Sequence, residues 1–320
     1  MNNLPEKLFS STFIDQNISI VIPTCKRIEK LSNLLDEVII QIRNLDLVDS
    51  IDIIVSDDDP KLSAHSLKNK YKNVNFIVGM FKGLTGNRLA LLKATTSDWL
   101  LYIDDDCLPG EQWLSSYISA INRNLECSFF SGPVLQTAPR SRMDQEAPQL
   151  RRGPGFHGCN FLIKRSLLSK IGNFNLSYPF HLEDIELSLR IKRNGSIMIF
   201  CDTATVIHPW RTIPSIQGKW LEFLAYIKLV KDYPEISSSF RPIVRFKLFV
   251  SKCVSYSNDL IKFRGRGFLK ATQLLFLEFL KIFLFSIFIT LFVLGRCLLW
   301  RVVIVHMHSY LYALPIFLLG

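Results

Sequence analysis

Residues 18–103 alternate between short apolar runs and segments whose apolar residues recur every three or four positions. The apolar runs predict strands at 18–22, 51–55, 74–78 and 99–103. The segments between them predict helices at 28–45, 64–71 and 87–95. Strands that alternate with helices are typical of an α/β fold with a mostly parallel sheet, and such sheets bind ligands at the carboxyl ends of their strands.

Polar residues follow three of these predicted strands directly. Thr24 and Arg27 come after the first strand, Asp57 comes after the second, and Asp104 and Asp106 come after the fourth. Because the carboxyl ends of parallel strands meet at one edge of a sheet, we expect these side chains to share one crevice.

Three consecutive acids, Asp104, Asp105 and Asp106, follow the apolar run WLLYI. In an extended chain successive side chains alternate, so Asp104 and Asp106 should share one side while Asp105 points elsewhere. Two carboxylates placed in this way predict a site for Mg²⁺ or Mn²⁺ that carries a diphosphate. The alternative interpretation is a solvated acidic turn, and the convergence of three strand ends favours the metal site.

Charge and composition narrow the partners of the chain. Its 320 residues are 48% hydrophobic, which predicts a folded core, and the net charge of +10 predicts an anionic partner. Nucleic acid, an acidic membrane surface and a phosphorylated substrate all qualify. Basic residues gather just before an apolar tail, at Arg241, Arg245, Lys247, Lys252, Lys262, Arg264, Arg266 and Lys270. This position favours lipid headgroups, and without a recognition-helix, RNP-like or zinc-finger pattern we expect no nucleic acid partner.

Cysteine usage and the N-terminus both indicate a cytoplasmic location for the first domain. The seven cysteines show no C-x-x-C spacing, and their odd number argues against a closed disulfide framework. The opening residues lack the apolar core of a signal peptide. We therefore expect reduced thiols and a domain on the cytoplasmic face of the cell membrane.

The C-terminal tail differs from the rest of the chain. Residues 274–295 and 298–320 form two apolar stretches, each close to the roughly 20 residues that span a bilayer. They predict one or two membrane spans; the alternatives are an amphipathic surface helix or an oligomer interface. His306 and His308 fit a packed or interfacial role better than a metal site. The expected division is a catalytic domain at 1–225, a basic helical linker at 226–270 and a membrane-associated segment at 271–320.

Six segments, taken in order, resemble the conserved blocks of the family 2 glycosyltransferases. They are ISIVIPTCKR (18–27), IIVSDD (53–58), GLTGNR (83–88), YIDDD (102–106), GCNF (158–161) and EDIELSLR (183–190). The resemblance covers residues 18–211. It implies a GT-A fold, which is Rossmann-like with a mostly parallel sheet, and an enzyme, in most members inverting, that uses a nucleotide sugar.

The resemblance also implies roles for individual residues. Nucleotide-sugar binding is implied for Pro23, Thr24, Arg27, Asp57, Arg88, Asp104 and Asp105. A divalent cation, Mg²⁺ or Mn²⁺, is implied at Asp106 with His208, although a lone histidine also fits a structural imidazole. Asp184 resembles the catalytic base, because the acceptor hydroxyl must lose its proton as it attacks the anomeric carbon. Glu183 and Asn160 are expected to support the site, and Glu183 also suits the helix dipole.

The function implied is transfer of a sugar, with UDP as the commonest carrier, to a lipid-linked or cell-envelope polysaccharide acceptor at the membrane. The chain lacks the Q-x-x-R-W motif after Trp210, which favours one sugar per encounter over polymer synthesis. Two alternatives stay open. A metal-dependent nucleotidyltransferase would also need paired acids, but 23–27 lacks the glycine of its phosphate loop. A non-catalytic membrane scaffold could bind nucleotide sugar without turnover.

Overall fold

A seven-stranded sheet forms the centre of the first of two units in the chain. The structure is a computed structural model that describes residues 17–293 except 154, 214 and 241. The sheet has the order β10-β6-β9-β4-β1-β2-β3. The neighbours β4-β1-β2-β3 pair in parallel, as do β10 and β6, while β9 runs antiparallel between β4 and β6. The predicted α/β fold with a mostly parallel sheet is confirmed.

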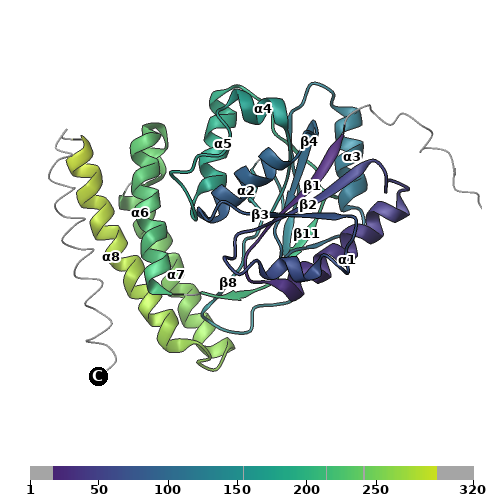
Figure 1. The fold of residues 1–320 in the computed structure, drawn as a ribbon. Helices are drawn as coiled ribbons and strands as arrows, with labels where there is room; N and C mark the ends of the chain where they lie inside the picture. Colours follow the sequence, from purple (N-terminus) through teal and green to yellow (C-terminus); the bar gives the residue numbers. More distant parts are fainter. Residues whose placement is uncertain (1–16, 154, 214, 241, 294–320) are drawn as a thin grey trace, which may run out of the picture. The chain divides into compact units, whose positions relative to one another are not determined.

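The elements of this unit follow one another closely along the chain (Figure 1). They are β1 (Ile18–Thr24), α1 (Ile28–Asn44), β2 (Ile51–Asp57), η1 (Ser63–Leu67), β3 (Val74–Val78), α2 (Gly83–Ala94), β4 (Trp99–Ile103), β5 (Leu108–Pro109), α3 (Trp113–Arg123), β6 (Phe129–Ser131), β7 (Val134–Gln136), β9 (Asn160–Lys164), α4 (Arg165–Lys170), α5 (Glu183–Arg193), β10 (Ile199–Phe200) and β11 (Val206–His208). The short strands β8 (Gln145–Glu146) and β12 (Arg211–Thr212) lie where the chain passes between the units.

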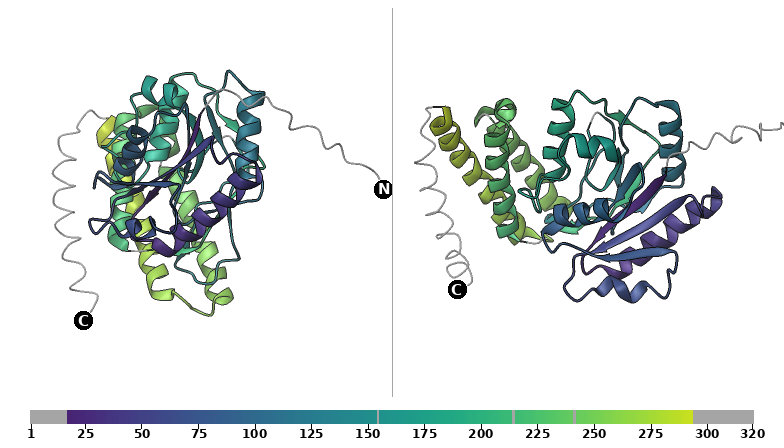
Figure 2. Two further views of the ribbon diagram at one scale, coloured as in Figure 1. Left: turned by 45° about the vertical axis from the view of Figure 1, so that its right-hand side comes forward. Right: turned by 45° about the horizontal axis from the view of Figure 1, so that its top comes forward.

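Helices cover both faces of the sheet, as Figure 2 shows. On one face Ile20, Ile22 and Leu101 pack with residues of α1 and α3; on the other, Val21 and Leu100 pack with residues of α2, α4 and α5. The central strands therefore have apolar residues on both sides, which explains their continuous apolar sequence.

Two predicted helices differ from the observed elements, in each case because of a side-chain contact. The expected helix at 64–71 is a 3₁₀ turn at 63–67, whose Ala64 N–H donates to the Asp57 carboxylate at 2.8 Å. Helix α2 begins at Gly83, four residues before its predicted start. Thr85, in its first turn, is held by a 2.5 Å hydrogen bond from its hydroxyl to the Tyr178 carbonyl.

A small second sheet, β5-β11-β7, brings a distant histidine to the acidic turn. Strand β5 follows the three acids after one intervening residue, and β11 pairs antiparallel to it, with Ile207 opposite Leu108. His208 is the last residue of β11. This pairing places residues about a hundred positions apart in sequence beside each other.

The second unit consists of 140–145 and the chain after residue 211, and most of its described residues are helical. It contains α6 (Ile216–Asp232), η2 (Pro234–Phe240), α7 (Pro242–Lys262) and α8 (Phe268–Val293). Within the described residues, one helical segment, Phe268–Phe288, is long and apolar enough to cross a membrane. The predicted second span, with His306 and His308, lies outside the described residues. The predicted boundary at residue 225 falls inside α6, and the three-part division stays a prediction.

Candidate active site

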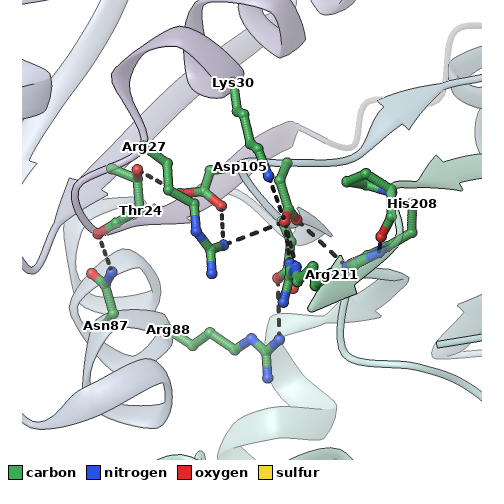
Figure 3. Close-up of polar contacts among 11 residues, drawn as sticks. Thr24, Arg27, Lys30, Asn87, Arg88, Asp105, His208 and Arg211 are labelled. Carbon is green, nitrogen blue, oxygen red and sulfur yellow. Dashed lines mark hydrogen bonds and ion pairs between the residues drawn. The ribbon is translucent and has the colours of Figure 1, made fainter. Parts of the chain in front are cut away.

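Asp106 is a fully buried carboxylate, and the cationic side chains around it, Arg27, Lys30 and Arg211, are labelled in Figure 3. Its Oδ2 accepts a hydrogen bond from Arg211 Nε at 2.6 Å and lies 3.6 Å from Arg27 Nη1 and 3.7 Å from Lys30 Nζ. Burial alone would raise the pKa of Asp106, but the charges of Arg211 and Arg27 outweigh it and hold the pKa below its usual value. Asp106 is therefore ionised at neutral pH.

The second oxygen of Asp106 faces His208. Within the described part of the chain, the buried Oδ1 has no hydrogen-bond partner, and it lies 3.6 Å from His208 Nε2. The Nδ1 atom of His208 lies 2.8 Å from the Pro209 carbonyl, so Nδ1 carries the proton and Nε2 has a free lone pair. Burial and the Arg211 charge lower the pKa of His208 and keep the ring neutral.

This pair suits a divalent cation. A carboxylate oxygen and an imidazole nitrogen face each other at a separation that one ion can bridge, and the Nδ1 hydrogen bond fixes the ring as outer partners of metal ligands do. The thiol of Cys107 belongs to the same cluster, within 4.8 Å. Contact with Cys159 and burial raise the pKa of Cys107 well above its usual value, so the thiol is neutral. One nitrogen ligand favours Mn²⁺ over Mg²⁺, which prefers oxygen alone.

Asp105 holds the loop after β1 in place. It accepts hydrogen bonds from Thr24 Oγ1 and from Arg27 Nη1, both at 2.7 Å, and it is buried. The strand alternation expected for the three acids does not continue past Ile103, because the chain turns there and Cys107 N–H donates to the Asp104 carbonyl. Asp105 and Asp106 consequently share Arg27, while Asp104 faces another arginine.

Arg88 is a buried arginine that joins two acidic regions. Its Nη1 donates to Glu183 Oε1 at 2.9 Å, and its Nη2 donates to the Gly158 carbonyl at 2.7 Å and lies 3.4 Å from Asp104 Oδ1. These contacts occupy most of the guanidinium. The expected proximity of Arg88 to nucleotide phosphates stays a prediction. The observed role is to link the acidic turn after β4 with the first turn of α5.

Asp184 is connected to the same arginine through one residue, Gly158. Gly158 N–H donates to Asp184 Oδ2 at 3.1 Å, while the Gly158 carbonyl accepts from Arg88. A Cβ atom at Gly158 would lie 2.6 Å from Arg88 Nη2, so only glycine fits without a shift. His157 Nδ1 lies 3.9 Å from the same Asp184 oxygen. The Asp184 carboxylate is partly exposed, at 19%, and can meet a substrate hydroxyl.

Glu183 has a perturbed protonation equilibrium that predicts a pH effect on stability. Burial raises its pKa to about 6, although Arg88 opposes the shift. A pKa above the unfolded value gives a stabilising contribution that is complete below the unfolded pKa and is lost as pH rises through the folded one. The free energy of unfolding should therefore fall between about pH 4.5 and 6 relative to a Glu183→Gln variant, measured by urea titration. Parallel pH profiles of the two proteins would contradict the shift.

Two predicted site residues, Asp57 and Pro23, have mainly structural contacts. Asp57 is buried and accepts hydrogen bonds from Asp59 N–H at 3.0 Å and Ala64 N–H at 2.8 Å, and its predicted contact with a base stays a prediction. Pro23 is buried within β1 opposite Ser56.

Asn160 supports the site indirectly, through four hydrogen bonds to residues around it. Its Oδ1 accepts from Trp113 and Tyr117, and its Nδ2 donates to the carbonyls of Pro133 and Ala204. The last two residues precede β7 and β11, so Asn160 fixes the strand that ends in His208.

Sequence reasoning overlooked three residues of the cluster. Lys30 lies one helical turn after Arg27, and Arg211 follows His208 by three positions. The short spacing of Lys30 from Arg27, and of Arg211 from His208, is the sequence signal that could have identified them. Gly158 was part of the GCNF block, but its contacts with both Asp184 and Arg88 depend on tertiary packing and could not be predicted.

The comparisons with known proteins agree with this geometry. Residues 19–172 match the model of the family described as Glycosyl transferase family 2. No curated protein matches the chain in sequence. Among solved structures, the fold resembles a crystal structure of GalNAc-T7 with UDP, GalNAc and Mn²⁺, with a TM-score of 0.50 and 16% identity over 61% of this chain. The match spans 44% of that protein's length. At this identity the likeness shows a GT-A-like fold.

Proposed function

Because residues 19–172 match the model of glycosyl transferase family 2, we propose that the protein transfers a sugar from a UDP-linked donor to an acceptor hydroxyl with inversion. The observation that carries this proposal is the pair of acidic sites joined by Arg88. One site, Asp106 with His208, suits a metal ion, and the other, Asp184, suits a base. An inverting displacement needs both, with different duties.

The cations around Asp106 suit the diphosphate of the donor. Arg27, Lys30 and Arg211 keep 40%, 48% and 35% of their side chains exposed, so they can reach a ligand. When bound, a divalent ion at Asp106 and His208 would act as a Lewis acid for the leaving diphosphate. The three cations would add charge-assisted hydrogen bonds to the phosphate oxygens. Mn²⁺ and UDP are also present in the crystal structure of the GalNAc-T7 neighbour.

Asp184 serves as the general base in this proposal. The acceptor oxygen forms a bond to the anomeric carbon as the bond from that carbon to the diphosphate oxygen breaks. The hydroxyl proton passes to Asp184, and the electron pair of the broken bond leaves with the nucleoside diphosphate. The Gly158 N–H holds the Asp184 carboxylate in position, and Arg88 positions Gly158 in turn. Arg88 and Glu183 are thus positioning residues.

The acceptor is proposed to be lipid-linked or a cell-envelope polysaccharide, met at the cytoplasmic face of the cell membrane. The basic residues between 241 and 270 and the apolar helix α8 support a membrane-side acceptor. One sugar is added per encounter, in agreement with the missing Q-x-x-R-W motif.

Thermal stabilisation by donors tests the donor class first. A panel of nucleotide sugars and nucleoside diphosphates is added to the full chain, each with and without Mn²⁺. A UDP compound should raise Tm only when Mn²⁺ is present, since binding to the folded state alone stabilises it. Stabilisation by compounds of a different nucleotide would show that the donor is not UDP-linked. If no compound stabilised the protein, the proposed donor site would be contradicted.

A further inference from the structure

Helices α7 and α8 of the second unit share an exposed apolar surface. On α7 its members recur at intervals of three, four, four and seven residues, and on α8 at seven, three and four, so each set is one helical stripe. We call these residues the apolar face: Ile243, Phe246, Val250, Val254, Ile261, Leu269, Phe276, Phe279 and Phe283. Ile261 is 82% exposed, Phe276 67% and Phe283 61%.

The two stripes form one continuous surface because the helices pack in antiparallel register. Tyr256 Oη lies 2.7 Å from Thr272 Oγ1, and Lys252 Nζ lies 3.1 Å from Glu278 Oε2. The rings of Phe249 and Phe279 are 5.8 Å apart. By the same register Phe246 lies level with Phe283, and Val254 lies level with Phe276, along the helix axes. Such a contiguous exposed apolar area on a folded unit indicates an interaction site.

The opposite side of α8 is already covered. Leu277, Leu284, Phe285 and Phe288 are buried in one cluster with Trp220, Phe223, Ile227 and Val230 of α6. Glu278 and Lys281 also lie away from the apolar face, and they pair with each other at 3.0 Å. If α8 crossed a bilayer in this packing, α6 would bring Lys219, Glu222 and Lys228 toward hydrocarbon, which is costly. The packing therefore favours a helix that lies at a surface.

The basic residues beside the apolar face indicate what kind of surface it binds. Between residues 242 and 270 the chain has seven basic residues, Arg245, Lys247, Lys252, Lys262, Arg264, Arg266 and Lys270, and one acidic residue, Asp259. Asp259 is paired with Arg140. Lys247, Lys262, Arg264 and Arg266 are exposed. An apolar stripe with basic residues at its sides is typical of helices that lie in the interface of an anionic membrane.

We propose that the apolar face of α7 and α8 inserts into the headgroup region of an anionic bilayer as an interfacial hairpin, with neither helix crossing the membrane. This attachment does not depend on sugar transfer, so either proposal can fail alone. It replaces the expected crossing of the first apolar stretch with a flat orientation of that helix.

Vesicle flotation with the full chain tests the proposal. The protein is added to preformed vesicles of phosphatidylcholine alone or mixed with phosphatidylglycerol. Wild type should float with the mixed vesicles, and the triple variant Phe246→Ser, Phe276→Ser and Phe283→Ser should bind at least about tenfold more weakly. The matched control is Ile40→Ser, Leu125→Ser and Ile197→Ser, exposed apolar residues of the other unit, and it should bind like wild type. Far-UV circular dichroism checks that each variant is folded.

A second variant set measures the headgroup contribution. Lys247→Gln, Lys262→Gln and Arg264→Gln together should reduce binding to mixed vesicles about tenfold or more. The control Lys68→Gln, Lys170→Gln and Lys192→Gln should have no such effect, since these exposed lysines belong to the other unit. If the triple serine variant and the triple glutamine variant both floated like wild type, the proposal would be overturned. Attachment would then be assigned to another segment, such as 294–320. A wild-type dimer that the serine variant separates, with no flotation, would also overturn it and identify a second copy as the occupant.

Discussion

The Asp184→Asn variant should lose sugar transfer by a factor of roughly 10² to 10⁴ while it binds the donor as wild type does. Asparagine keeps an oxygen that can accept from Gly158 N–H, so the local geometry is preserved. Its amide cannot take the acceptor proton at neutral pH, and the attacking oxygen would have to lose that proton to water. The rate is measured as nucleoside diphosphate released in the presence of acceptor, and binding is measured as donor-induced change in Tm.

The matched control for this variant is Asp98→Asn, which changes an exposed acid at the start of β4 on the opposite edge of the sheet. It should leave transfer and binding unchanged. Glu183→Gln should retain most of the transfer, because Glu183 contacts Arg88 and is not expected to contact the acceptor. If Asp184→Asn transferred sugar at the wild-type rate, the base would have to be a different residue.

The second large effect is expected for Asp106→Asn, which should abolish Mn²⁺ binding and with it Mn²⁺-dependent donor binding. Asp106 supplies the only carboxylate of the described metal-ligand cluster, and the amide oxygen that replaces it is a neutral and weaker ligand. The asparagine substitution is preferred to alanine because it preserves the volume beside Arg211 and Arg27. Electron paramagnetic resonance of free Mn²⁺ measures the affinity directly.

Cys107→Ser is the control for the metal prediction. The thiol is neutral and packs against Cys159, so its replacement should leave the Mn²⁺ affinity unchanged. His208→Ala should weaken Mn²⁺ binding less than Asp106→Asn does, because it removes a neutral ligand. Wild-type Mn²⁺ affinity in Asp106→Asn would contradict the assignment of the metal site.

Much of the first unit could be predicted from the sequence because its signals are local. The apolar runs at β1, β2 and β4 are almost wholly buried, the edge strand β3 is buried on one side, and the predicted positions of all four match the observed strands. Two of the polar residues at their ends, Arg27 and Asp106, lie 3.6 Å apart there, while Thr24 donates to Asp105, which was expected to point elsewhere. Hydrophobic periodicity and the edge rule for parallel sheets were sufficient for this part.

The partners of individual side chains could not be predicted, because they depend on distant contacts. Arg88 contacts Glu183, Asp104 and Gly158, and no local pattern around residue 88 indicates these three partners. Its expected proximity to phosphates stays a prediction. Asp104 was expected to share a side with Asp106, and the sequence did not indicate that the two acids have different partners: Arg88 lies 3.4 Å from Asp104, while Arg211 donates to Asp106. Arg211 reaches Asp106 only because β11 pairs with β5. No local pattern encodes these contacts.

The second unit shows a different limit of sequence reasoning. The apolar stretch after residue 274 satisfies the length criterion for a span, and length alone cannot reveal what covers each side of the helix. The packing of α8 against α6 supplies that information.

The most direct test of the central claim is the identity of the products formed from a nucleotide sugar. The full chain is incubated with Mn²⁺, radiolabelled UDP-sugars and a membrane lipid extract, and the products are separated by chromatography. The account predicts nucleoside diphosphate and a labelled glycolipid or saccharide, both absent with Asp184→Asn. Two results would contradict the account. If the donor bound but no nucleoside diphosphate formed, the protein would be a non-catalytic scaffold. If the protein made a nucleotide sugar and pyrophosphate from a nucleoside triphosphate and a sugar phosphate, it would be a nucleotidyltransferase.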